Sequence, residues 1–234
     1  MKEKNMSPGK ILKQKFRVGR MAGFFTLVYM LGLALLAWGV DDLAGFVSNP
    51  VRAAFAVIAI AQALFHIWII LRMPPQPKFE LPPDQEHWHY GLAELIAILA
   101  AFGDRRNILT WSDSPSLRWV GLGVLLLGAS YAIWANLTWV DHLRREAEQA
   151  CDNPVLLSAG PFRWTRYPSL LVLIFCGLGF ALSFRSWTGL VFLVALIGII
   201  IRRINLWEKM YAQRYQHAWA LRCQASKRIL PFLY

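Results

Sequence analysis

Charged side chains are scarce in this sequence, and acidic ones are the scarcest. They make up 17% of the 234 residues, with 14 acidic against 25 basic residues, whereas hydrophobic residues make up 56%. A soluble domain is typically about a quarter charged. The shortage of charge therefore excludes an ordinary soluble domain and favours a membrane protein.

Cysteine is also scarce, with three residues at uneven spacing: Cys151, Cys176 and Cys223. An odd, scattered set does not form a disulfide framework. Internal repeats and low-complexity segments are absent from the sequence. The basic N-terminal segment precedes a full-length apolar run, so we expect a signal anchor that stays on the protein.

Long apolar runs are what the sequence does contain. Five have nearly the roughly 20 residues that cross about 30 Å of hydrocarbon: Ala22–Val40, Val51–Leu71, Leu117–Val140, Pro168–Phe184 and Trp187–Ile201. A sixth segment, Tyr90–Gly103, is shorter and contains Glu94, which leaves a tilted span, a re-entrant segment or an interfacial helix open. The sequence predicts an all-α, polytopic transmembrane protein with five to six spans.

The basic residues are distributed as in a membrane protein. If the N-terminus is cytoplasmic and six helices cross, all but five of the 25 Lys and Arg lie on the cytoplasmic side. The exceptions are Arg52, Arg105, Arg106, Arg118 and Arg185. This asymmetry follows the positive-inside rule and predicts a multi-pass integral membrane protein with both termini cytoplasmic. The positive charge then serves topology and contact with membrane lipids, and no nucleic-acid partner is expected.

The chain divides into three parts. Residues 1–72 carry a basic tail and a two-helix transmembrane hairpin, and residues 73–89 form a Pro-rich cytoplasmic linker. Residues 90–234 form the remaining core, with a cytoplasmic C-terminal tail.

A short connection brings two polar segments together. Only "SFRSW", Ser183–Trp187, joins the last two apolar runs, so these runs must form a tight antiparallel hairpin. The loop Gly160–Pro168 before the hairpin and the segment Arg203–Tyr215 after it should then meet. Glycines in the two runs permit close helix approach; they are Gly177, Gly179, Gly189 and Gly198.

The stretch "NPVLLSAGPFRWTRYPSLL" and the later "LWEKMYAQRYQHAWALRCQASKRILPFLY" carry a resemblance. Together they resemble the isoprenylcysteine carboxyl methyltransferase family, over roughly Leu117–Tyr234. The resemblance implies a methyltransferase-like core that binds S-adenosylmethionine in a cytoplasmic pocket and methylates a hydrophobic or lipid-like acceptor. It implies cofactor-binding residues Leu157, Gly160, Phe162, Arg166, Tyr167, Pro168 and Glu208, with Tyr167 and Glu208 also catalytic.

The sequence departs from the family pattern at four positions. Tyr167 and Pro154 stand where the family has histidine, Leu170 where it has tyrosine, and Trp207 where it has glutamate. With an ordinary pKa near 10, a tyrosine is a poor general base at neutral pH. The pattern therefore preserves the framework and alters the polar positions.

The types of residue in this segment suit such a cofactor. Backbone groups of a Gly-Pro turn can contact an adenine or an amino-acid group, and Phe162 or Trp164 can stack on a base. Glu208 can hold a ribose hydroxyl or an ammonium group. Methyl transfer then needs alignment of nucleophile, methyl carbon and leaving sulfur, with water excluded.

Two other functions stay open. The ending "KRILPFLY" also resembles membrane steroid 5α-reductases, which use NADPH, although "SLLVLIFCGLGFAL" lacks the acidic residues those proteins carry after the proline. A non-catalytic membrane protein that retains the fold is the other, and the four departures favour it.

Several polar residues outside these stretches have weaker interpretations. In "EHWHY", Glu86, His87 and His89 could ligate a metal, but no matching second pair follows, so no metal is expected. Gln62 and His66 share one helix face, and an interhelical hydrogen bond is the favoured reading. A final group could line the entrance for the acceptor: Asn136, Asp141 and His142.

Overall fold

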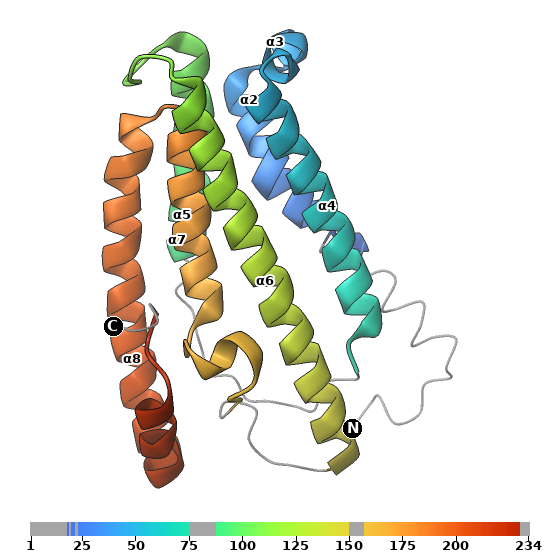
Figure 1. Ribbon diagram of the computed structural model, residues 1–234, viewed down its shortest axis with the longest axis vertical. Helices are drawn as coiled ribbons and strands as arrows, with labels where there is room; N and C mark the ends of the chain where they lie inside the picture. The colour runs from blue at the N-terminus through green and yellow to red at the C-terminus, as the bar shows by residue number, and fades with distance from the viewer. Residues whose placement is uncertain (1–17, 19, 22, 75–87, 150–156, 230–234) are drawn as a thin grey trace.

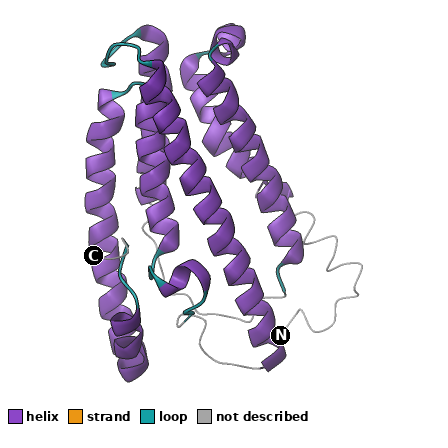
Figure 2. Cartoon of the chain, in the orientation of Figure 1, coloured by secondary structure: helices purple, strands orange, loops and turns teal. Residues whose placement is uncertain are grey.

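The structure, a computed structural model, describes the chain apart from residues 1–17, 19, 22, 75–87, 150–156 and 230–234. The described residues form helices joined by short loops and contain no strand (Figure 2). The helices are α2 (Leu33–Trp38), α3 (Leu43–Ser48), α4 (Pro50–Arg72), α5 (Trp88–Arg106), α6 (Pro115–Gln149), α7 (Pro168–Ser183) and α8 (Trp187–Ala225). The structure also contains a π-helix, η2 (Val28–Gly32), and two 3₁₀ helices, η3 (Val40–Asp42) and η5 (Gly160–Arg163). The predicted all-α class is confirmed.

Each apolar run of the sequence is helical, but the helices differ in how well they suit a bilayer. Three of them, α4, α6 and α8, are long and apolar enough to cross a membrane. A fourth candidate is the pair Gly23–Trp38 and Val40–Ser48, which is bent by 86°. Helix α7 has only 16 residues, and α5 ends in the charged residues Asp104, Arg105 and Arg106. Length and composition thus identify three to four spanning helices.

The first predicted span, Ala22–Val40, does not run straight to its end. The helix stops at Trp38, and the chain turns at Gly39, whose φ of 118° favours glycine because an L side chain rarely adopts it. After the turn, the Asp42 side chain accepts a hydrogen bond from the backbone N–H of Gly45 and caps α3. The sequence pattern predicted the apolar stretch but not this corner.

Two of the predicted spans extend further as helices than their apolar runs. Helix α8 has 39 residues, with a break at Gln216, and continues well beyond the predicted end at Ile201. Its start is capped by Ser186, whose hydroxyl accepts from the backbone N–H of Gly189. Helix α6 likewise continues past Val140 to Gln149. Both helices therefore carry their apolar parts toward one end of the molecule and a polar part toward the other.

The helices run roughly parallel to one long axis, which gives the molecule two ends (Figure 1). One end, the Asp104 end, holds the α2–α3–α4 corner, the α5–α6 loop and the α7–α8 turn. The opposite end, the Glu208 end, holds η5 and the C-terminal part of α8. Helices α7 and α8 form the antiparallel hairpin that the short connection predicted.

Close packing of α6 against α7 depends on small residues. A Cβ added to Gly179 would lie 2.9 Å from the Gly121 carbonyl oxygen, and one added to Gly128 would lie 2.9 Å from the Phe175 side chain. The expected close approach at Gly179 is therefore confirmed. At Gly198 it is wrong, because an added Cβ would meet nothing within 4 Å.

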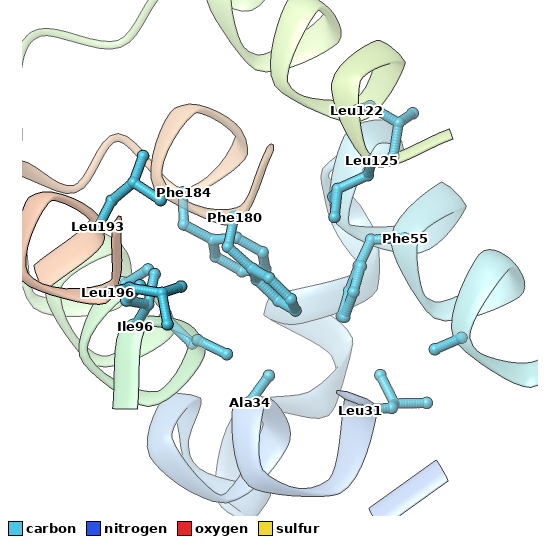
Figure 3. Close-up of a cluster of buried hydrophobic side chains, with 14 of the residues drawn as sticks. Leu31, Ala34, Phe55, Ile96, Leu122, Leu125, Phe180, Phe184, Leu193 and Leu196 are labelled. Carbon is cyan, nitrogen blue, oxygen red and sulfur yellow. The ribbon is translucent and has the colours of Figure 1, made fainter. Parts of the chain in front are cut away.

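An aromatic cluster forms the centre of the apolar core (Figure 3). The Phe55 ring of α4 lies 5.0 Å from Phe180 and 5.8 Å from Phe184, which come from α7 and its C-terminal cap. The three are nearly or completely buried. A polar contact also joins two helices, because the His66 Nδ1 lies 2.8 Å from the Thr26 hydroxyl. The predicted interhelical hydrogen bond of His66 is confirmed.

One buried carboxylate holds the Asp104 end together. The Asp104 side chain is fully buried and accepts hydrogen bonds from three arginines: Arg52 at 2.9 Å, Arg118 at 2.7 Å and Arg185 at 2.7 Å. These arginines come from α4, α6 and the α7–α8 turn, while Asp104 belongs to α5. We call this group, with Asp113, the Asp104 network.

The Asp104 network gives a structural role to three of the five arginines that the sequence assigned to the outside. Arg52, Arg118 and Arg185 do lie at the end opposite η5, but they are buried. Their remaining donors go mainly to backbone carbonyls, including those of Phe46 and Ser183. Asp113 accepts from Arg118 Nε at 2.6 Å, and this hydrogen bond lowers the pKa of Asp113 below its ordinary value. The charges at this end are structural.

Replacing the central carboxylate should destabilise the fold strongly. Asp104→Asn leaves three buried guanidinium groups without their shared anion, a change that typically costs about 3–5 kcal/mol. We expect a large drop in the midpoint of thermal unfolding in detergent. The matched control is Asp41→Asn. This change removes the ion pair between Asp41 and Arg105, and the Asp41 side chain is 71% exposed. Equal, small shifts for both variants would contradict the structural role of the Asp104 network.

Candidate functional site

The loop before α7 is shaped by one glycine and two prolines. Gly160 has φ 53°, and an added Cβ would lie 2.5 Å from the Thr138 hydroxyl of α6, so the position requires glycine. Pro161 falls in the first turn of η5, and Pro168 opens α7. The loop is thereby fixed as a compact turn against α6.

Aromatic side chains seat this loop on α6. The Phe162 ring centroid lies 6.1 Å from that of Trp139, and the Trp164 ring centroid lies 5.5 Å from that of Trp134. His142 continues the row, 6.2 Å from Trp139. The loop therefore lies beside the part of α6 that carries His142, one of the residues suggested for the acceptor entrance.

A second segment crosses the same loop from the C-terminal side. Helix α8 is broken at Gln216, which has φ 40° and ψ −112°. Residues 217–229, which we call the C-terminal strap, then lie along the loop. The Lys227 N–H donates to the Trp164 carbonyl at 3.0 Å, and the Arg166 N–H donates to the Lys227 carbonyl at 2.8 Å. These two bonds make a parallel bridge between Thr165 and Lys227.

An ion cluster joins the loop, α8 and the strap. Arg166 donates to Glu208 Oε1 from Nη2 at 2.6 Å and from Nε at 3.0 Å, and both side chains are largely buried. Arg228 donates from Nε to the other oxygen, Oε2, at 2.8 Å. Arg166 Nη1 also donates to the Ser226 carbonyl and, at 3.3 Å, to that of Cys223. Both oxygens of Glu208 are thus held by arginines.

Two departures from the family pattern contact each other here. The Tyr167 and Trp207 ring centroids lie 5.5 Å apart, and the Arg203 guanidinium lies 4.5 Å from the Trp207 ring. The Tyr167 hydroxyl is buried and has no hydrogen-bond partner in the described part of the chain. Burial and the negative charge of Glu208 both raise the pKa of Tyr167. Its phenol therefore stays protonated at neutral pH and cannot act as a general base.

The residues inferred from the resemblance gather at the Glu208 end. Leu157 is buried directly before the loop, Gly160 and Phe162 belong to η5, and Pro168 opens α7. Only Arg166 and Glu208 of this set are joined by an ion pair. The Pro154 position and the Leu230, Pro231 and Phe232 tail lie outside the described residues, as do Glu86 and His87.

Sequence reasoning missed two strap arginines that contact the site. Arg228 holds Glu208, and Arg222 is buried and donates from Nη2 to the Phe162 carbonyl. The other terminal nitrogen of Arg222, Nη1, has no partner in the part of the structure that is described. The signal was weak, because "LRCQASKR" looks like an ordinary basic tail and the break at Gln216 that returns it to the loop leaves no mark in the sequence.

Neither a metal centre nor a known relative identifies the ligand of this site. Among the described residues, no group of three or more His, Cys, Asp or Glu side chains is placed to hold a metal ion. Comparison with protein-family models, curated proteins and solved structures finds no match to this chain. The chemistry of Arg166, Tyr167 and Glu208 is therefore the basis for a functional proposal.

Proposed function

We propose that this chain is an integral membrane methyltransferase that uses S-adenosylmethionine to methylate a small hydrophobic or lipid-like acceptor. The observation that carries the proposal is the ion pair between Arg166 and Glu208, 42 residues apart in sequence. It brings together the two segments that resemble the isoprenylcysteine carboxyl methyltransferase family.

The charges at the Glu208 end fit the amino-acid group of that cofactor. An amino-acid group carries one carboxylate and one ammonium, and the opened Arg166–Glu208 pair offers one cation and one anion of the matching kinds. Bound S-adenosylmethionine would supply an electrophilic methyl group on a sulfonium. The Tyr167 hydroxyl and Arg222 Nη1, which have no partner among the described residues, supply further donors in the same region.

The residues around Tyr167 also constrain the acceptor. Leu170 is buried, and Tyr167 and Trp207, whose rings are tilted by 40° to each other, replace the His and Glu of the family pattern with an aromatic pair. These apolar and aromatic side chains suit a hydrophobic acceptor. Because Tyr167 stays protonated, no base is offered at that position. The acceptor is then best a group that does not have to lose a proton before it attacks the methyl carbon at neutral pH.

The membrane arrangement is part of the proposal. All six helical regions cross the bilayer, with α5 and the short α7 shielded by their neighbours, and the Glu208 end faces the cytoplasm. The support is the charge asymmetry of the sequence, because all but five of the 25 basic residues fall in segments that this topology assigns to the cytoplasmic side.

Reporter fusions test this arrangement. A reporter inserted after Arg106, in the α5–α6 loop, and one fused to the C-terminus should report opposite sides of the membrane, because an odd number of crossings separates them. Full-length protein carrying each reporter should be compared in intact cells. A report from the same side would show that six crossings are wrong.

A non-catalytic membrane protein is the second candidate. It is favoured by one observation, that both carboxylate oxygens of Glu208 are bonded within the chain by Arg166 and Arg228. A reductase of the steroid 5α-reductase kind has less support, because α7 contains no acidic residue.

Binding of S-adenosylmethionine to purified protein in detergent decides between the first two candidates. Glu208→Gln removes a charged hydrogen-bond acceptor for the cofactor, which should weaken binding by about 1–3 kcal/mol, or about 5- to 150-fold in Kd. Isothermal calorimetry provides the measurement.

The control is Arg202→Gln, on the same helix as Glu208. The Arg202 side chain is exposed. It should leave the affinity unchanged. For each variant, a cooperative unfolding transition above the assay temperature shows that the protein measured is folded. Absent binding by the wild type, or equal and small effects of the two substitutions, would favour the non-catalytic candidate.

A further inference from the structure

The C-terminal strap uses the same groups that the proposed cofactor needs. Two carbonyls of the strap, those of Cys223 and Ser226, accept hydrogen bonds from Arg166. The strap's Arg228 holds the second oxygen of Glu208. With the strap in this position, neither member of the Arg166–Glu208 pair is open to an incoming ligand.

The strap is joined to the rest of α8 by a strained residue. Gln216 has φ 40° and ψ −112°, a conformation that a residue with a side chain rarely adopts. The helix before it and the helical turns after it are each regular. A change of φ and ψ at this one residue could therefore swing the strap as a unit.

Few apolar contacts hold the strap down. Trp219 is buried and lies 4.9 Å from the Tyr211 ring, and Ile229 joins the apolar core. Its polar contacts include the bridge between Thr165 and Lys227, the bonds to Arg166, Glu208 and Asn205, and the bond from Arg222 to the Phe162 carbonyl. A segment held mainly in this way can open while the bundle stays folded.

We propose that the strap is an autoinhibitory lid that closes the Arg166–Glu208 pair and opens at Gln216 to admit a ligand with an amino-acid group. The identity of that ligand rests on the proposed function, but the opening does not. In the closed state, Ser226 and Cys223 carbonyls occupy the place of a ligand carboxylate on Arg166. Arg228 occupies the place of a ligand ammonium on Glu208.

A reversible crosslink across the bridge tests the lid. Thr165→Cys and Lys227→Cys are introduced into full-length protein in which Cys151, Cys176 and Cys223 are replaced by serine. Residues opposite each other in a bridge are close enough for a disulfide. Oxidation should lower the apparent affinity for S-adenosylmethionine by at least about tenfold, because the disulfide holds the strap closed and removes the open molecules that bind. Reduction of the same sample should restore the affinity.

The matched control is the pair Thr110→Cys and Ser186→Cys, which are bridge partners at the Asp104 end. Its affinity should be the same in both redox states. Equal affinity of the oxidised and reduced Thr165–Lys227 protein would overturn the lid.

Hydrogen exchange separates failure of the lid from failure of the proposed function. In wild-type protein without ligand, the backbone amides of Arg166 and Lys227 should exchange at least about tenfold faster than those of Leu196 and Ile200 in the buried part of α8. If this holds while no form binds S-adenosylmethionine, the strap opens but the proposed cofactor is wrong. If the two sets exchange at the same rate, the strap opens only with the whole bundle and the lid is wrong.

Discussion

The buried carboxylate of Asp104 is the constraint on which the rest of the structure depends. Three guanidinium groups converge on it from α4, α6 and the α7–α8 turn. Buried charges are tolerated only where they are paired and hydrogen-bonded. Asp104 and Asp113 balance two of the three arginine charges, and backbone carbonyls such as those of Phe46 and Ser183 accept the remaining donors. The helix ends are therefore fixed relative to one another at this end.

Because the helices are fixed relative to one another at the Asp104 end, the lengths of α7 and α8 determine which residues meet at the Glu208 end. In the α7–α8 hairpin, Arg166 lies 19 residues before Arg185 (185 − 166) and Glu208 lies 23 residues after it (208 − 185). Two antiparallel segments that leave one turn bring such nearly equidistant positions to the same level. The ion pair at 2.6 Å between Arg166 and Glu208 follows from this register. A structural network at one end thus positions the polar groups of the candidate site at the other.

Part of this arrangement could be predicted from the sequence, because it depends on local pattern. The apolar runs became helices, "SFRSW" formed the hairpin turn, and His66 found a partner on another helix. The Asp104 network could not be predicted, since no spacing links Arg52, Arg118 and Arg185 before the helices pack. The strap depends on one unusual backbone conformation at Gln216, and the partner of Glu208 in the strap depends on that break. The sequence therefore indicated that the two segments of the site meet, but not that the C-terminal strap covers them.

Photochemical labelling tests most directly whether the Glu208 end holds the proposed cofactor. Full-length protein in detergent is irradiated with S-adenosylmethionine that carries an isotopic label, and the modified peptides are identified by mass spectrometry. We expect saturable labelling confined to residues 157–168 and 203–229, lost when excess unlabelled cofactor is present. Labelling that is not saturable, or that falls on α4 or on residues 23–48, would contradict a cofactor site built from Arg166 and Glu208.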